Sequence, residues 1–167
     1  MDILDYAKEI ESQGIEHYSN LAKEVELKEL ESIFEFLVRE EKRHYEIFDS
    51  WQKESAVPSV DNTGILTQAK GAFQKLSDHF KTASFVAIDR DEAYNKALEF
   101  ENKSISLYTD ALDKLGDGMN DGKYRDTLKS IIDQEKKHAR LITSLKEFQR
   151  HPGEWLENAE WYHFDQY

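Results

Sequence analysis

The stretch LVREEKRHYEIF, residues 37–48, contains Glu41 and His44 three positions apart, between large apolar residues. The stretch IIDQEKKHARLI, residues 131–142, contains Glu135 and His138 in the same arrangement. Side chains three or four positions apart lie on the same face of a helix. Each stretch therefore predicts a carboxylate and an imidazole side by side on the apolar face of a helix.

Similar apolar faces, each interrupted near its middle by a glutamate, recur along the chain. Spacings of three and four residues indicate long amphipathic helices. We expect them at about residues 2–25, 28–54, 90–115 and 122–149, with a shorter crossover helix at about 65–81. The first face carries Glu11 and the third carries Glu101, whereas the two Glu-x-x-His pairs interrupt the second and fourth faces.

A glutamate at the centre of a helical bundle needs a partner, because removing an ionised carboxylate from water costs several kcal/mol otherwise. The four apolar faces carry no lysine or arginine that could pair with these glutamates. Two divalent cations would balance four carboxylates, and imidazole nitrogen is a good ligand for iron, zinc or manganese. We therefore predict a metal site formed by Glu11, Glu41, His44, Glu101, Glu135 and His138.

An internal repeat supports this prediction. Residues 7–22 align with residues 97–112 at an offset of 90 (101 − 11), and the Glu-x-x-His pairs align at an offset of 94 (135 − 41). The chain is thus interpreted as two copies of a helical hairpin joined by a crossover. In each antiparallel hairpin the glutamates lie equally far from the turn, so all six candidate ligands can occupy one layer.

Glu-x-x-His alone is a weak signal, because a surface contact between neighbouring turns has the same spacing. A third pair, Glu160 and His163, lies near the C-terminus and has no repeated counterpart. We interpret it as a surface pair, and whether it binds anything is left open.

Composition restricts the function. The chain has 167 residues and a net charge of −12, which fits one acidic domain and argues against nucleic-acid binding. The absence of cysteine excludes disulfides, thiol catalysis and four-cysteine iron sites within these residues. The N-terminal sequence has no apolar signal core, and no apolar stretch approaches the length of a membrane span. We therefore expect a cytoplasmic protein with no membrane partner.

The C-terminal sequence HPGEWLENAEWYHFDQY is short and rich in aromatic residues. So many aromatic side chains are unfavourable in water. We expect a bundle at residues 1–149 and an aromatic tail at residues 150–167 that packs on the bundle or across a dimer. The alternative interpretation is a peptide that docks to a partner.

The motifs ESQGIEHY, EEKRHYEIF, ENKSISLY and DQEKKHARLI resemble those of rubrerythrin-type proteins in the ferritin-like superfamily. The resemblance covers about residues 2–149. It implies an all-α, antiparallel four-helix bundle with a long crossover between the second and third long helices. It also implies two iron ions, held by the six residues above, that react with peroxide or oxygen; zinc or manganese are alternatives.

Four further residues are candidates for supporting roles. Tyr18 and Tyr108 each follow a candidate ligand by two turns, so they could donate hydrogen bonds to ligand carboxylates, supply single electrons, or simply fill the core. Glu40 and Gln134 directly precede the Glu-x-x-His motifs. Similar proteins use this position to hold the imidazole N–H of a facing ligand, although a solvated side chain is the alternative.

Two departures from the rubrerythrin pattern bear on activity. Rubrerythrins carry an extra glutamate one turn after the ligand of the third long helix, where this chain has Ser104. They also carry a cysteine-ligated iron site as electron inlet, so this chain would need an external electron donor protein. We expect a homodimeric oxidoreductase with peroxidase or ferroxidase chemistry. The alternative is a non-enzymatic iron- or zinc-binding module whose tail docks to a partner.

Overall fold

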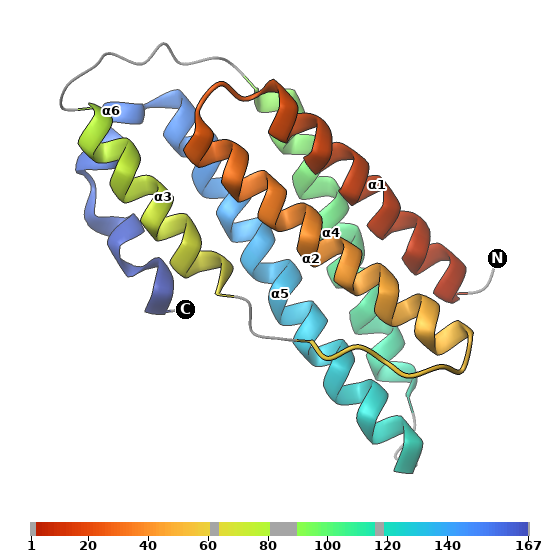
Figure 1. Ribbon diagram of the computed structural model, residues 1–167. Helices are drawn as coiled ribbons and strands as arrows, with labels where there is room; N and C mark the ends of the chain where they lie inside the picture. Colours follow the sequence, from red (N-terminus) through yellow and green to blue (C-terminus); the bar gives the residue numbers. More distant parts are fainter. Residues whose placement is uncertain (1–2, 61–63, 81–89, 116–118, 167) are drawn as a thin grey trace.

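The computed structural model describes residues 3–60, 64–80, 90–115 and 119–166 (Figure 1). Most of these residues form helices, and no strand occurs among them. The long helices are α1 (Ile3–Glu24), α2 (Lys28–Gln52), α4 (Asp91–Lys114) and α5 (Met119–Arg150). The shorter helix α3 (Ile65–Phe80) lies in the crossover between α2 and α4. The predicted all-α ferritin-like bundle with a long crossover is confirmed.

The bundle consists of two antiparallel hairpins, α1–α2 and α4–α5, which pack against each other (Figure 1). Neighbouring helices run in opposite directions, whereas α2 and α4 run in the same direction. The chain must therefore cross the length of the bundle between α2 and α4. Helix α3 lies beside α2 and α5 along this crossover.

The helix boundaries agree with the prediction within about two residues, except at the start of α5. That helix begins at Met119, although the sequence suggested a loop up to about residue 122. Gly122, at the predicted start of this helix, lies within it and has open space around it. An exposed glycine costs a helix only about 0.8–1.0 kcal/mol relative to alanine, which a helix of this length tolerates. Residues 116–118 of the predicted loop lie outside the described part.

A polar layer divides the apolar core into two clusters. The smaller cluster includes Ala7, Phe48, Tyr108 and Ile131. The larger cluster includes residues of all four long helices, of α3 and of the C-terminal tail. On each long helix the candidate metal ligands lie in sequence between residues of one cluster and residues of the other. The fold thus places six polar side chains between two apolar regions.

The C-terminal tail is helical and lies against α3 and the end of α5 (Figure 1). It forms α6 (Pro152–Glu157) and the 3₁₀ helix η1 (Ala159–Gln166). Trp161 is completely buried, and its indole N–H donates to the carbonyl of Leu156 at 3.2 Å. Trp155 contacts Phe73 of α3, with ring centroids 4.3 Å apart. The aromatic side chains therefore extend the larger core cluster.

None of the helices in the described part of the chain is both long enough and apolar enough to span a membrane.

Removing the Trp161 side chain tests how much the tail contributes to stability. We expect Trp161→Ala to lower the free energy of unfolding by about 3–5 kcal/mol, because the substitution leaves a large cavity between the tail and α3. Urea unfolding of the two proteins measures the difference. Tyr162→Ala, at a side chain that is 42% exposed, is the matched control and should cost much less. Equal, small effects would contradict a structural role for the tail.

Candidate metal centre

Six side chains with potential metal-binding atoms meet in the polar layer. The helix α1 contributes one carboxylate and α4 another, whereas α2 and α5 each contribute a carboxylate and an imidazole. Each of the six is at most 3% exposed. They are Glu11, Glu41, His44, Glu101, Glu135 and His138. The structure thus brings together every ligand that the sequence predicted.

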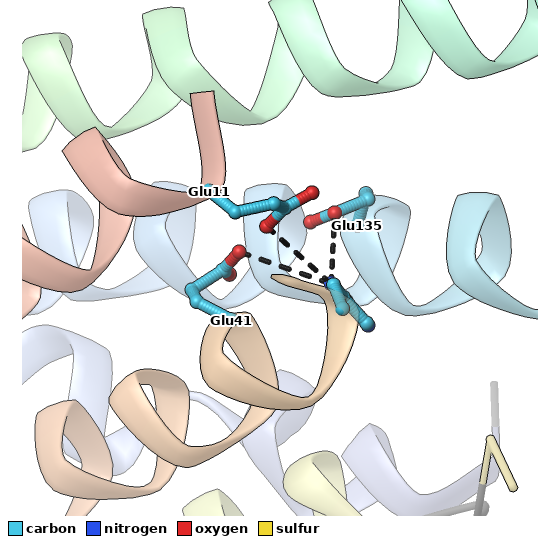
Figure 2. Close-up of side chains that lie close together, drawn as sticks. Glu11, Glu41 and Glu135 are labelled. Carbon is cyan, nitrogen blue, oxygen red and sulfur yellow. Dashed lines mark ion pairs between the residues drawn. The ribbon is translucent and has the colours of Figure 1, made fainter. Parts of the chain in front are cut away.

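The six side chains form two candidate metal positions, and the first of them contains His44. Its Nδ1 lies 3.1 Å from Glu135 Oε1, 3.7 Å from Glu11 Oε2 and 3.8 Å from Glu41 Oε2. Figure 2 shows the three carboxylates converging on one point from α1, α2 and α5. One nitrogen and three oxygens are a suitable ligand set for a divalent transition metal.

The second position centres on His138. Its Nδ1 lies 3.0 Å from Glu41 Oε1, 3.3 Å from Glu135 Oε2 and 3.5 Å from Glu101 Oε2. The two imidazole rings are nearly parallel, with centroids 6.0 Å apart. The candidate donor atoms within each position lie within 4.8 Å of one another.

Glu41 and Glu135 belong to both positions. Each directs one carboxylate oxygen toward His44 and the other toward His138. Glu11 and Glu101 each belong to one position only. This pattern, with two shared and two unshared carboxylates, is the arrangement that bridges two metal ions.

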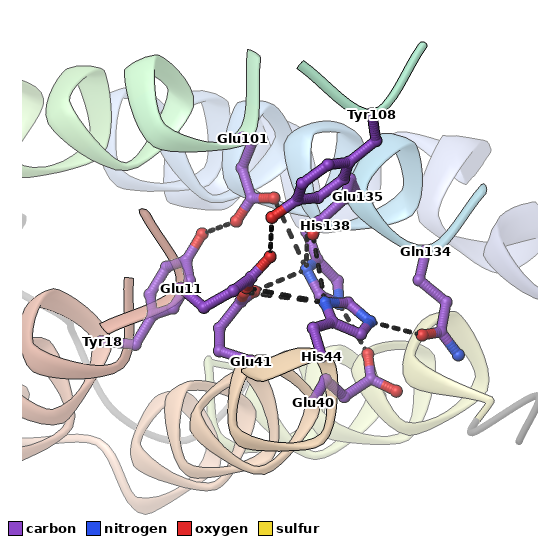
Figure 3. A network of polar contacts seen from close by, with 10 residues as sticks. All are labelled: Glu11, Tyr18, Glu40, Glu41, His44, Glu101, Tyr108, Gln134, Glu135 and His138. Carbon is purple, nitrogen blue, oxygen red and sulfur yellow. Dashed lines mark hydrogen bonds and ion pairs between the residues drawn. The ribbon is translucent and has the colours of Figure 1, made fainter. Parts of the chain in front are cut away.

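Hydrogen bonds at the far side of each ring orient the imidazoles (Figure 3). His138 Nε2 donates to Glu40 Oε2 at 2.6 Å, and His44 Nε2 donates to Gln134 Oε1 at 2.7 Å. A proton on Nε2 leaves the lone pair on Nδ1, which faces the carboxylates. Glu40 and Gln134 thus occupy the supporting positions that the sequence suggested, and both are buried.

The two tyrosines donate hydrogen bonds to ligand carboxylates across the bundle, not along their own helices. Tyr18 of α1 donates to Glu101 of α4, and Tyr108 of α4 donates to Glu11 of α1 (Figure 3). Both hydroxyls bind Oε1, which leaves Oε2 of each glutamate directed at the metal position. The exchange holds the unshared carboxylates in place from the opposite hairpin.

The remaining polar atoms test whether metal ions fit this site. Buried atoms without a hydrogen-bond partner include Nδ1 of both imidazoles and at least one oxygen of each of the four carboxylates. Buried polar atoms are normally satisfied, so a cluster of unsatisfied donor atoms needs a ligand. In the part of the chain that the structure describes, no lysine or arginine forms an ion pair with these carboxylates. The donor set therefore fits two divalent cations.

The electrostatics differ between the unshared and the shared carboxylates. Burial, followed by the charges of Glu135 and Glu41, raises the pKa of Glu11 well above its usual value. Burial and the charge of Glu41 likewise raise the pKa of Glu101. Burial alone would also raise the pKa of Glu41, but its contacts with Glu11 and the imidazoles lower it well below the usual value. In the metal-free protein, the unshared carboxyls are therefore the ones that hold protons.

The imidazoles also hold protons in the absence of metal. Burial by itself lowers the pKa of His44, but the charge of Glu135 and the close carboxylates of Glu11 and Glu41 raise it well above its usual value. Burial likewise lowers the pKa of His138, whereas the charge of Glu101 raises it, and the net result is a pKa well above the usual value. Metal ions must displace these protons, so metal affinity should increase with pH.

Gly14 and Ser104 lie beside the candidate ligands. Both are buried in the polar layer, one turn after Glu11 and Glu101 respectively. A Cβ atom on Gly14 would lie 3.6 Å from Cγ of Glu41, which is an ordinary contact, so there is room for a methyl group but not for a longer side chain. Sequence reasoning assigned no role to Gly14, although a glycine three residues after Glu11 is a signal that another helix approaches closely.

The third Glu-x-x-His pair does not belong to this centre. The Glu160 side chain lies outside the described part of the chain, and His163 is an exposed residue of η1. The centre thus contains only residues of the two hairpins.

The raised pKa values predict how the stability of the metal-free protein depends on pH. Because Glu11, Glu101 and both imidazoles have raised pKa values, the folded state binds more protons than the unfolded state above about pH 4.5. Stability should therefore fall as pH rises through these values. The melting temperature of metal-free protein should decrease by several degrees between about pH 5.5 and pH 8, since about 1 kcal/mol corresponds to about 2–4 °C in a domain of this size.

The double variant Glu11→Gln/Glu101→Gln is the control for this prediction. Glutamine retains an acceptor for each tyrosine hydroxyl but removes the ionisable group. The melting temperature of the double variant should depend less on pH, and at pH 8 it should exceed that of the metal-free wild type. A steeper pH dependence in the variant would contradict the assignment of the protons.

Gly14 offers a second test of the geometry. Gly14→Ala should retain metal binding and increase stability by up to about 1 kcal/mol, because alanine favours the helix and its methyl group fits. Gly14→Leu should displace Glu41 and reduce metal binding. Metal content by mass spectrometry and thermal unfolding measure both effects. Full metal binding by the leucine variant would show that Glu41 is not held against α1.

Comparison with known proteins agrees with this geometry. No curated protein and no solved structure matches the chain. A model of the rubrerythrin family matches residues 2–146, which include both hairpins and all six candidate ligands. The chain therefore belongs to the rubrerythrin family.

Proposed function

We propose that this protein is a di-iron oxidoreductase that reacts with peroxide or oxygen, with rubrerythrin-like peroxidase or ferroxidase chemistry. The observation that carries the proposal is the sharing of Glu41 and Glu135 between two imidazole-centred positions. Such sharing serves no purpose for a single ion. Iron suits a set of four carboxylates and two imidazoles, and in related constellations this set holds two iron ions.

Iron bound by this ligand set would supply the electrons that reduce peroxide or oxygen. The protein contributes the surroundings of the reaction. The ligands are buried between two apolar clusters, which limits access of bulk water. Glu40 and Gln134 keep the lone pairs of the imidazoles directed at the metal positions. These features orient the ligands before the metal arrives.

The tyrosines keep protons beside the unshared carboxylates. Burial, and then the charge of Glu101, raises the pKa of Tyr18 well above its usual value. Burial and the charge of Glu11 do the same for Tyr108. Both phenols therefore stay protonated and donate to the carboxylates near neutral pH. Each phenol is a local source of a proton, or of an electron and a proton, for reduction of the oxidant.

Electrons would have to come from outside these 167 residues. The chain contains no cysteine, so no four-cysteine iron site can form within it. A separate electron donor protein, a homodimeric state and a cytoplasmic location stay predictions.

A second candidate function is a non-enzymatic iron- or zinc-binding module. Ser104 favours it, because this buried hydroxyl occupies the position where rubrerythrins carry an additional ligand carboxylate. One metal position then lacks an alternative ligand for a different oxidation state. The two candidates differ in whether the bound metal changes oxidation state in response to oxidant.

Anaerobic titration with ferrous iron, followed by peroxide or oxygen, distinguishes the two functions. The oxidoreductase predicts two iron ions per chain and a new visible absorption band after oxidant is added. Binding of one ion, or of zinc in preference to iron, with no spectral change would contradict it.

Substitution of single glutamates identifies the ligands. Glu41→Ala and Glu135→Ala should each abolish binding of at least one ion, since both residues contact both positions. Glu9→Ala and Glu99→Ala are matched controls, because these exposed glutamates lie two residues before Glu11 and Glu101 and point away from the layer. Iron content after desalting measures the outcome. Equal losses in both sets would show that the buried layer is not the metal site.

A further inference from the structure

An apolar pocket of about 430 Å³ lies at the end of the bundle where α1 begins and α4 ends. Its volume falls within the range typical of small-molecule sites. Phe48, Trp51 and Tyr124 form an aromatic part of its wall, and the rest consists of Tyr108, Lys114 and aliphatic residues. The pocket opens to solvent, since the exposed residues Ile3 and Lys114 line it.

The wall of the pocket is built from packed side chains. The ring of Trp51 meets those of Phe48 and Tyr124 edge to face, with centroids 5.5 Å and 4.9 Å apart. These contacts hold the indole against the wall. Ala7 and Ala111, whose side chains are short, line the pocket one turn from Glu11 and from Tyr108. Small residues at these two positions leave space that larger apolar residues would fill.

The inner part of the pocket adjoins the metal centre. Tyr108 is 1% exposed and lines the pocket with its ring, while its hydroxyl donates to Glu11. A molecule in the pocket would thus be separated from a candidate metal ligand by a single phenol. The pocket itself contains none of the six candidate ligands.

The charge at the mouth of the pocket indicates the kind of ligand. Among the described residues that line it, Lys114 alone carries a charge, and no hydrogen bond or ion pair occupies its ammonium group. Arg125 donates to the carbonyl of Leu115, so a second cation lies beside the wall. Asp113 precedes Lys114 on α4 but does not line the pocket. Lys114 thus supplies a positive charge at the mouth of this pocket in a protein whose net charge is −12.

From this geometry we infer that the pocket binds an apolar monocarboxylate of the size of a medium-chain fatty acid. The apolar chain would occupy the space between Trp51, Tyr108 and Ala111, and the carboxylate would pair with Lys114 at the mouth. Burial of the chain supplies the affinity, and the cation selects the acid over uncharged molecules. This inference concerns a site separate from the metal centre and does not depend on its redox activity.

Calorimetric titration of the full, metal-loaded chain with decanoate, below the micellar concentration, tests the inference. We expect saturable binding of one molecule per chain, and a change in tryptophan fluorescence that Trp51→Phe abolishes while binding persists. Trp155 and Trp161 lie in the tail region and serve as an unaffected background. An absence of saturable binding would overturn the inference.

Filling the pocket should prevent binding. Ala111→Phe should weaken decanoate binding by about tenfold or more, because the ring occupies the space of the chain. Ala139→Phe is the matched control, since Ala139 is also a partly buried alanine of a long helix but does not line the pocket. Circular dichroism and metal content verify that both variants fold. Equal affinities in these two variants would overturn the location of the site.

Reversing the charge at the mouth tests the carboxylate. Lys114→Glu should weaken decanoate binding by about fivefold and leave the binding of decanol unchanged, since an exposed charge pair is worth up to about 1 kcal/mol. Lys136→Glu, at another exposed lysine, should change neither.

If decanol binds as tightly as decanoate in the wild type, the ligand class is wrong. If Ala111→Phe instead converts a dimer into a monomer, a second copy of the chain occupies the pocket and the inference fails.

Discussion

The rest of this structure depends on one constraint, namely that four glutamates lie at the buried centre of a helical bundle, where no lysine or arginine of the described residues balances their charge. An uncompensated buried carboxylate costs several kcal/mol, so the layer must take up protons or metal ions. The protein accommodates the layer by building apolar clusters on both sides of it. Long helices, a long crossover and a packed tail all serve to complete those clusters.

The internal repeat explains why the two halves of the site are nearly symmetric. The symmetry is broken where the two repeats differ in sequence. Each hairpin contributes one unshared carboxylate, one shared carboxylate and one imidazole. The supporting residues differ, however, because His138 donates to a carboxylate of Glu40 and His44 to an amide of Gln134. A hydrogen bond to a charged acceptor is the stronger of the two. His138 is therefore the more electron-rich ligand, and the two metal positions are chemically different.

Much of the fold, and the clustering of the six candidate ligands, could be predicted from the sequence, because the glutamates interrupt apolar faces at repeated positions. The tyrosine partners could not be assigned, since Tyr18 lies two turns from Glu11 and only the antiparallel packing of α1 and α4 brings it to Glu101. The helical tail was also missed. Its elements are too short to show a periodic pattern, and Pro152 lies in the first turn of α6, where proline is tolerated.

The two shared glutamates make the candidate metal site a property of the whole bundle. The hairpin α1–α2 alone offers Glu11, Glu41 and His44, and its counterpart offers the other three, so neither half can surround two ions. Joining them requires contacts between residues about ninety positions apart, whose formation is slow because a long chain segment must first be closed. A metal ion bound between the hairpins would cross-link them. It would oppose separation of the hairpins but would not prevent the ends of each helix from fraying.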